Sequence, residues 1–249
     1  LRWEARIFEG PDSRDFLHRL TTIHVRGLQP GDPASWGFFL SAVGKIRAAF
    51  KLSCLDQNSF LFELDGSAPG AWAAALSETI EQFTLSERQS LSESKGWTCL
   101  WVFLEEQEDP KSLGLTASRV IDHGSHDFGK RWLSLWLDSS RSQSFTQGFR
   151  PITRAELDSW RVGLVRPWFG SEITRDVNPL ELGLGDGVTQ QKGCYPGQEV
   201  IERMITQGAP PRRLCLISDL KTSQPKLALI KKNEAETGKV IVHPELGEC

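Results

Sequence analysis

Residues 192–204 read KGCYPGQEVIERM and form the densest cluster of unusual residues in the chain. Gly193 and Gly197 bracket a short stretch in which glycine can adopt backbone angles that other residues avoid. Pro196 fixes one backbone dihedral and suits the first turn of a helix. The alternation of apolar and charged residues that follows predicts a helix over residues 198–204. The segment therefore predicts a tight turn that leads into an amphipathic helix.

Cys194 lies just ahead of this helix and two residues after Lys192. A helix N-terminus and a nearby ammonium group both favour the thiolate form of a cysteine. The first interpretation is therefore a reactive thiol. The alternative is a small buried cysteine in a turn built by glycines, because most free cysteines are packing residues.

The rest of the chain mixes strands and helices, often with two or more strands in succession. Apolar runs of strand length and pairs of turn residues predict strands at residues 36–40, 46–55, 59–64, 98–104 and 133–137. Apolar residues at helical spacing predict helices at residues 12–22, 69–83 and 154–165. This order favours an α+β fold over a doubly wound parallel sheet.

The composition describes a globular protein with balanced charge. The chain has 249 residues, 39% of them hydrophobic, which is enough for one large domain or two modest ones. Its 29 basic and 32 acidic residues give a net charge of −3, which argues against general binding to nucleic acid or to an anionic membrane. No apolar run reaches the roughly 20 residues of a membrane span. Residues 1–10 lack the apolar core of a signal peptide.

The five cysteines are scattered and include no C-x-x-C pair. A disulfide framework is therefore not expected, and a reducing, cytoplasmic location is the prediction. The same spacing argues against a zinc site or an iron–sulfur cluster held by this chain alone.

The pattern K-G-C-Y-x-G-Q-E-x-x-x-R-M resembles the signature of the YgfZ branch of the aminomethyltransferase-like (GcvT/YgfZ) folate-binding proteins. That branch includes the mitochondrial iron–sulfur assembly relatives of bacterial YgfZ. Three further segments look like parts of the same family, at residues 12–22, 39–45 and 178–182. The resemblance covers residues 1 to about 215.

The resemblance implies ferredoxin-like α+β domains around a central channel that binds tetrahydrofolate, with the signature cysteine at its rim. Residues 1–30 and 112–205 would form a discontinuous folate-binding domain, and residues 31–111 an inserted α+β domain. Residues 206–249 would form a short or truncated C-terminal β domain, a reduced version of the family's barrel.

The implied role is support of iron–sulfur cluster assembly or repair, with Cys194 as the functional thiol and Lys192 as its support. The implied partners are a folate and iron–sulfur enzymes or assembly factors, with no membrane and no resident metal. Five residues of the motif would face the folate pocket: Gly193, Tyr195, Gln198, Glu199 and Arg203. The last two are spaced for an ion pair on the helix.

Two departures from the family bear on the chemistry. True aminomethyltransferases carry an Asp-Asp pair where this chain has Ala48 and Ala49. An alanine cannot accept a proton or stabilise a cation, so ordinary aminomethyl transfer is not expected. Gly163 stands where relatives carry a glutamate that pairs with the N–H donors of the pterin ring. Glu172, in the following loop, is the candidate replacement.

Two other functions remain open, a folate-dependent one-carbon transferase and a non-catalytic binding module that has lost folate affinity.

Three other features of the sequence give weaker indications of a site. His123 and His126 form an H-x-x-H that is expected on a solvated loop rather than at a metal. Arg212 and Arg213 could contact an anion. The nine tryptophans predict core and groove packing.

Overall fold

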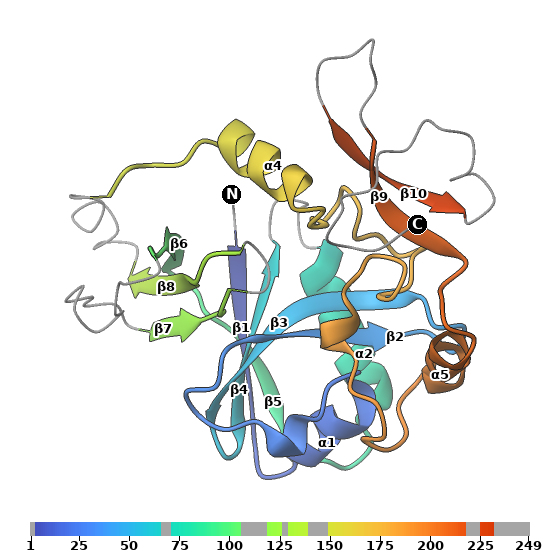
Figure 1. Cartoon of the computed structure of the whole chain (residues 1–249). Helices are drawn as coiled ribbons and strands as arrows, with labels where there is room; N and C mark the ends of the chain where they lie inside the picture. The colour runs from blue at the N-terminus through green and yellow to red at the C-terminus, as the bar shows by residue number, and fades with distance from the viewer. Residues whose placement is uncertain are drawn as a thin grey trace.

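The computed structural model describes residues 3–65, 71–105, 119–125, 129–138, 149–217 and 225–231. The strands form a five-stranded, a three-stranded and a two-stranded sheet. Figure 1 shows the first two side by side, and the third follows α5. The elements are β1 (Trp3–Glu9), α1 (Ser13–Leu20), η1 (Val25–Gly27), β2 (Ser35–Leu40), β3 (Ile46–Asp56), β4 (Ser59–Asp65), α2 (Ala71–Phe83), β5 (Ser90–Glu93), β6 (Trp97–Phe103), β7 (Arg119–Asp122), β8 (Trp132–Asp138), α4 (Arg154–Gly163), η3 (Gly185–Gly187), α5 (Gln198–Thr206), β9 (Arg212–Ile217) and β10 (Lys226–Lys231).

The fold is mixed α/β, and every pair of these strands is antiparallel. The larger sheet has the order β2-β3-β4-β1-β5, so the first strand of the chain lies near its middle. On one face α1 packs its Phe16 ring 5.6 Å from Phe8 of β1. This sheet includes strands from both sides of the boundary expected at residue 30. The division of the chain into domains stays a prediction.

The predicted helices correspond to α1, α2, α4 and α5, and the predicted strands to β2, β3, β4, β6 and β8. Three strands of the two larger sheets were not predicted. β5 and β7 have four residues each, and such short segments do not show the alternation of apolar and polar residues that predicts a strand. In β1 the apolar residues are interleaved with Glu4 and Arg6, and its burial depends on the neighbours that the fold supplies.

Glu63 of β4 joins the larger sheet to the smaller one, which has the order β6-β8-β7. Its carboxylate is fully buried and accepts hydrogen bonds from Trp136 Nε1 at 2.8 Å and from the Ser134 hydroxyl. The other carboxylate oxygen lies 3.2 Å from His123 Nε2. Burial alone would raise the pKa of Glu63, but the charge of His123 and these hydrogen bonds outweigh it and hold the pKa below its ordinary value.

His123 was expected on a solvated loop, and this expectation is wrong. The residue is only 2% exposed, and its ring stacks on Trp132 at 3.6 Å. His126 lies outside the described residues. Because Ser134 and His123 both point into the protein interior, this Ser-His-Glu grouping ties two sheets together and does not present a nucleophile to solvent.

β9 and β10 form a two-stranded antiparallel sheet. The backbone N–H of Leu214 in β9 donates to Glu181 O at 2.9 Å, which attaches this sheet to the body of the protein. The described residues form no closed barrel in this region. Within the described ranges, no helix has the length and apolar character needed to cross a bilayer.

The Glu63 cluster predicts a large effect on stability. Glu63→Ala leaves the imidazole, hydroxyl and indole donors buried without their acceptor, so the free energy of unfolding should fall by about 3–5 kcal/mol. Urea denaturation followed by circular dichroism measures this loss. Glu199→Ala is the matched control, because its ion pair with Arg203 is exposed and should contribute little. Equal stability of the two variants would contradict the assigned role.

Candidate functional site

The turn before α5 has the backbone that the motif predicts. Gly193 and Gly197 have φ angles of 105° and 81°, in the region that favours glycine. Gly197 also packs against the turn between β2 and β3. A Cβ atom on Gly197 would lie 2.5 Å from Ser41 O and 3.1 Å from Gly44 Cα. Glycine is therefore required here both for its φ angle and for the close approach of two turns.

Cys194 is exposed at this turn. Of the other described cysteines, Cys54 and Cys215 are buried and Cys99 is half-buried. Burial and the charge of Glu63 raise the pKa of the Cys99 thiol well above its ordinary value, so Cys99 stays protonated. The alternative of Cys194 as a buried packing residue does not hold. Its thiol is accessible to a partner.

Lys192 anchors the loop that carries Cys194. Lys192 is 7% exposed, and its ammonium group donates to His18 O in the last turn of α1 and lies 4.9 Å from the centroid of the Tyr195 ring. A cation at a helix C-terminus is favourable because it faces unpaired carbonyl groups. Burial and the charge of Arg26 lower the pKa of Lys192 to about 8, while the charge of Cys194 opposes that shift. Lys192 is thus both an anchor and a charge near the thiol.

His18 completes this anchor and was not predicted. Its Nε2 lies 2.9 Å from Lys192 O, so His18 and Lys192 are joined by two hydrogen bonds that run in opposite directions. Burial and the charge of Lys192 lower the pKa of His18, which favours the neutral ring. Nε2 then carries the proton donated to Lys192 O. The sequence has no local signal for this contact, because the two residues are 174 positions apart.

A buried carboxylate, Glu181, holds the turn against which the motif packs. Glu181 accepts from Arg212 at 2.9 and 3.0 Å and from the backbone N–H of Asn178 at 2.9 Å. Asn178 in turn donates its side-chain amide to Gly44 O at 2.8 Å. Burial works against the charge of Glu181, but Arg212, the Asn178 N–H and Lys45 outweigh it and lower the pKa. Arg212, considered a contact for an external anion, is therefore engaged by an internal one.

The other predicted site residues lie on and beside α5. Tyr195 is buried beneath Lys192, and burial together with the charge of Glu202 raises its pKa to about 12. Gln198 donates to Glu202 at 2.6 Å on the exposed side of the helix. The predicted ion pair of Glu199 and Arg203 is confirmed at 2.9 Å and is exposed. Contact of these residues with a folate stays a prediction.

The residues that depart from the family pattern lie elsewhere. Ala48 and Ala49 are fully buried in β3, opposite Phe39 and Phe38 of β2. Gly163 is the last residue of α4 and is exposed.

Glu172, the candidate replacement acid, is engaged inside the protein. Its carboxylate accepts from Arg161 Nη1 and from the Trp168 backbone N–H, both at 2.9 Å. Glu172 therefore positions the loop that carries Trp168.

A second feature is a tryptophan cluster where the two larger sheets meet. The Trp101 ring lies 4.4 Å from Trp132, 4.8 Å from Trp3 and 5.4 Å from Trp168. The cluster surrounds a cavity of about 20 Å³, room for about one water molecule. The lining comprises Trp3, Trp36, Lys51, Trp101, Trp132, Arg166, Pro167, Trp168, Phe169 and Leu184. It includes no residue of the motif turn and, in the described part of the chain, no carboxylate.

A wider cleft opens beside this cavity and shares Trp3 and Trp101 with it. The cleft has a volume of about 1020 Å³ and runs between β6 and the start of α4. The sequence predicted that the tryptophans pack in the core and in grooves. The nine tryptophans against one tyrosine were the available signal, but no pattern in the sequence indicates which of them meet.

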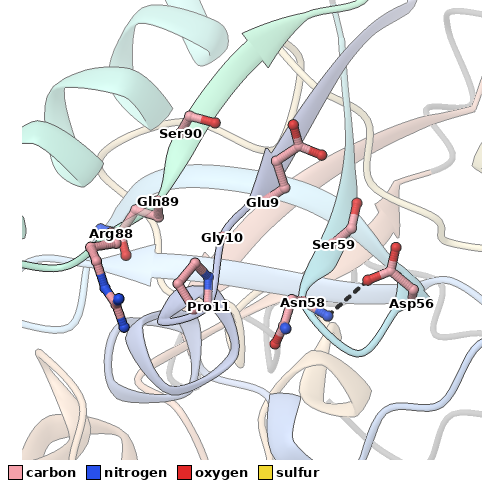
Figure 2. A pocket seen from close by; sticks show the side chains of 9 residues that line it. All are labelled: Glu9, Gly10, Pro11, Asp56, Asn58, Ser59, Arg88, Gln89 and Ser90. Atoms are coloured by element: carbon pink, nitrogen blue, oxygen red, sulfur yellow. Dashed lines mark hydrogen bonds between the residues drawn. The ribbon is translucent and has the colours of Figure 1, made fainter.

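A third hollow lies at the opposite end of the larger sheet, where β1 ends and β4 and β5 begin (Figure 2). It is open and is lined by Glu9, Asp56 and Arg88 among others. Asp56 accepts from the backbone N–H of Asn58 at 2.8 Å. Across the described ranges, no group of three or more His, Cys, Asp or Glu side chains is arranged to hold a metal ion.

Comparison with known proteins identifies the fold. No family model matches the chain. A chloroplastic transferase-like protein of Arabidopsis thaliana is 33% identical over 239 residues, which cover 87% of this chain and 54% of that protein. An aminomethyltransferase of Halalkalibacterium halodurans is 33% identical over 63 residues, or 25% of this chain and 17% of the enzyme. This chain thus spans about half the length of the Arabidopsis relative.

Among solved structures, the glycine cleavage system aminomethyltransferase T of Bartonella henselae is similar, with a TM-score of 0.69. The match covers 90% of this chain and 66% of that chain at 17% sequence identity. The chain therefore has the aminomethyltransferase-like fold.

The buried ammonium of Lys192 predicts a pH dependence of stability. Its pKa of about 8 in the folded protein lies below the ordinary value of 10.5, so the unfolded chain binds more protons between these pH values. The stability contributed by Lys192 should therefore rise as the pH increases from 8 to 10. Urea denaturation of the protein and of Lys192→Met across this range measures the difference. A difference that does not change with pH would contradict the buried position of the ammonium.

Proposed function

We propose that this chain is a YgfZ-like, folate-binding-type accessory protein that supports iron–sulfur cluster assembly or repair through the thiol of Cys194. The observation that carries the proposal is the exposure of Cys194 on a loop that is anchored at both ends. Lys192 fixes one end to α1, and Gly197 packs the other end against the turn at Gly44. A thiol that reacts with a large partner has to be accessible and held in a constant orientation. An exposed cysteine on an anchored loop meets both conditions.

The chemistry open to Cys194 follows from its exposure and its charged neighbour. The Lys192 ammonium attracts a Cys194 thiolate, and this attraction opposes the lowering of the Lys192 pKa. A thiolate can ligate an iron–sulfur cluster transiently, exchange with the thiol of a partner or hold a one-carbon adduct. Each of these reactions needs an accessible sulfur, and Cys194 is exposed. The cluster is cargo in this scheme.

A folate is the proposed small-molecule partner, and the tryptophan cluster is its proposed contact. Flat aromatic walls fit a flat heterocycle, because rings stack and pack edge to face. Trp3 and Trp101 would hold such a ring at the inner end of the wide cleft. The fit is incomplete, because the cavity beyond these rings has room for about one water molecule. The two carboxylates that line the cleft, Glu105 and Glu156, are already paired with Lys130 and Arg150.

A folate-dependent one-carbon transferase is the second candidate, and the names of the relatives favour it. That reaction needs an acid near the folate. Ala48 and Ala49 are buried alanines in β3, and Glu172 is already held by Arg161. Tetrahydrofolate-dependent release of formaldehyde would support this candidate. The third candidate is a non-catalytic binding module that has lost its affinity for folate.

The thiol proposal predicts that Cys194→Ala abolishes support of iron–sulfur enzymes in cells that lack the chain. Its stability should stay within about 1 kcal/mol of the unchanged protein, because an exposed side chain loses little packing. Enzyme activity in the extract and urea denaturation measure the two effects. Cys99→Ala is the matched control and should retain function, because Cys99 is half-buried and stays protonated. Normal function of Cys194→Ala would refute the proposal.

The folate part of the proposal has a separate test. Calorimetric titration with tetrahydrofolate and with folinic acid should give a binding isotherm, and binding should quench tryptophan fluorescence because the site is built from indoles. No heat at high micromolar concentration would remove the folate from the proposal. The Cys194→Ala experiment would then decide between a thiol role without folate and the third candidate.

A further inference from the structure

His18 is a buried histidine whose two ring nitrogens have different surroundings. The residue is 6% exposed. Its Nε2 lies 2.9 Å from Lys192 O and donates to it, while Nδ1 has no hydrogen-bond partner among the described residues. A neutral ring with its proton on Nε2 has none on Nδ1. A second proton would turn Nδ1 into a buried, charged donor that lacks an acceptor, which is costly.

The charged groups that face His18 are basic. Lys192 comes from the motif loop, and His24 and Arg26 come from the segment of η1. The His24 ring lies edge to face with the His18 ring, with the centroids 4.9 Å apart. Asp15 of α1 is paired with Arg26 at 2.7 Å, and within the described ranges no carboxylate forms an ion pair with His18. Burial and the charge of Lys192 hold the pKa of His18 below 6.5, although the hydrogen bond to Lys192 O opposes them.

A proton on His18 would act on the loop of Cys194 through Lys192. The two hydrogen bonds that fix this end of the loop both join His18 to Lys192. The pKa of Lys192 is about 8, so its ammonium is charged throughout the range in which His18 gains a proton. Two like charges in a buried contact repel each other. The attachment of the loop to α1 is therefore weakest when both residues are charged.

We propose that His18 is a pH-sensitive latch, which holds the loop of Cys194 against α1 while its ring is neutral and releases the loop when the ring is protonated. Gly197 still packs against the turn at Gly44 after release, so only the end of the loop at Lys192 becomes free. Cys194 then has a fixed orientation at neutral pH and a variable one in acid. The inference goes beyond the proposed function, because it concerns the position of the sulfur and holds for any reaction of the thiol.

Trypsin tests the latch, because it cleaves after Lys192 only when this buried side chain leaves its site. Cleavage of the full chain between residues 192 and 193 is followed by mass spectrometry at about pH 7 and about pH 5.5. Each rate is divided by the rate for a peptide of residues 188–197, which corrects for the effect of pH on the protease. Because the open loop takes up a proton below the ordinary histidine pKa of 6.5, the corrected rate should rise several-fold in acid, and by at most about tenfold per pH unit.

Three controls separate the latch from general acid unfolding. Lys51 is 3% exposed in β3, so cleavage after it requires global unfolding, and an equal rise there would overturn the inference. His18→Gln keeps an N–H donor and gains no proton, so its corrected rate should not rise in acid. His24→Gln changes an exposed neighbour and should keep the rise. No rise in the unchanged protein, or the same rise in His18→Gln, would refute the latch.

A second measurement needs no substitution. Tyr195 is the only tyrosine of the chain, and its ring lies 4.9 Å from the Lys192 ammonium. In protein with ¹³C-labelled tyrosine, a single set of ring signals should therefore shift as the pH falls from about 7 to about 5, because the ammonium leaves the ring. Ring signals that stay fixed over this range would overturn the inference. Neither measurement involves a folate or an iron–sulfur cluster, so either can fail while the Cys194→Ala experiment succeeds.

Discussion

Two opposed hydrogen bonds between His18 and Lys192 hold the loop of Cys194 to the first helix of the chain. Each residue donates to the backbone carbonyl of the other, so both the side chain and the backbone of Lys192 are engaged. The arrangement places an ammonium at the C-terminus of α1, where unpaired carbonyls attract it. Cys194 is exposed on this loop, which Lys192 attaches to α1 at one end and Gly197 packs against the turn at Gly44 at the other.

Buried carboxylates elsewhere serve the same purpose of joining distant elements. Glu63 connects the larger sheet to β8 through Ser134 and Trp136, and Glu181 connects the turn at Asn178 to β9. Taking a carboxylate out of water is costly and is offset only when several donors converge on it. The carboxylate of Glu63 on β4 meets donors from β8 and from His123, and the carboxylate of Glu181 meets Arg212 of β9. These residues therefore fix how the elements lie relative to one another.

The tryptophan cluster between the two larger sheets is less acidic than the folate site that the family resemblance implied. The positions expected to carry an acid are alanines, and most of the residues that line the small cavity between the sheets are aromatic. The similarity to aminomethyltransferase T is therefore a similarity of fold, and it does not carry the side chains of that enzyme's site over to this chain. A fold can keep its core and change its ligand in this way, because the two depend on different side chains.

The sequence by itself determined the local features of this protein. Periodicity located four helices and five strands, and the spacing of Gly193 and Gly197 predicted the turn, because both signals depend on neighbours along the chain. The tertiary structure alone decided the contacts across long separations. The pairing of His18 with Lys192, the burial of His123 and the meeting of Trp3 with Trp168 fall in this class. Such contacts follow from how sheets and helices pack, and no local pattern of residues encodes them.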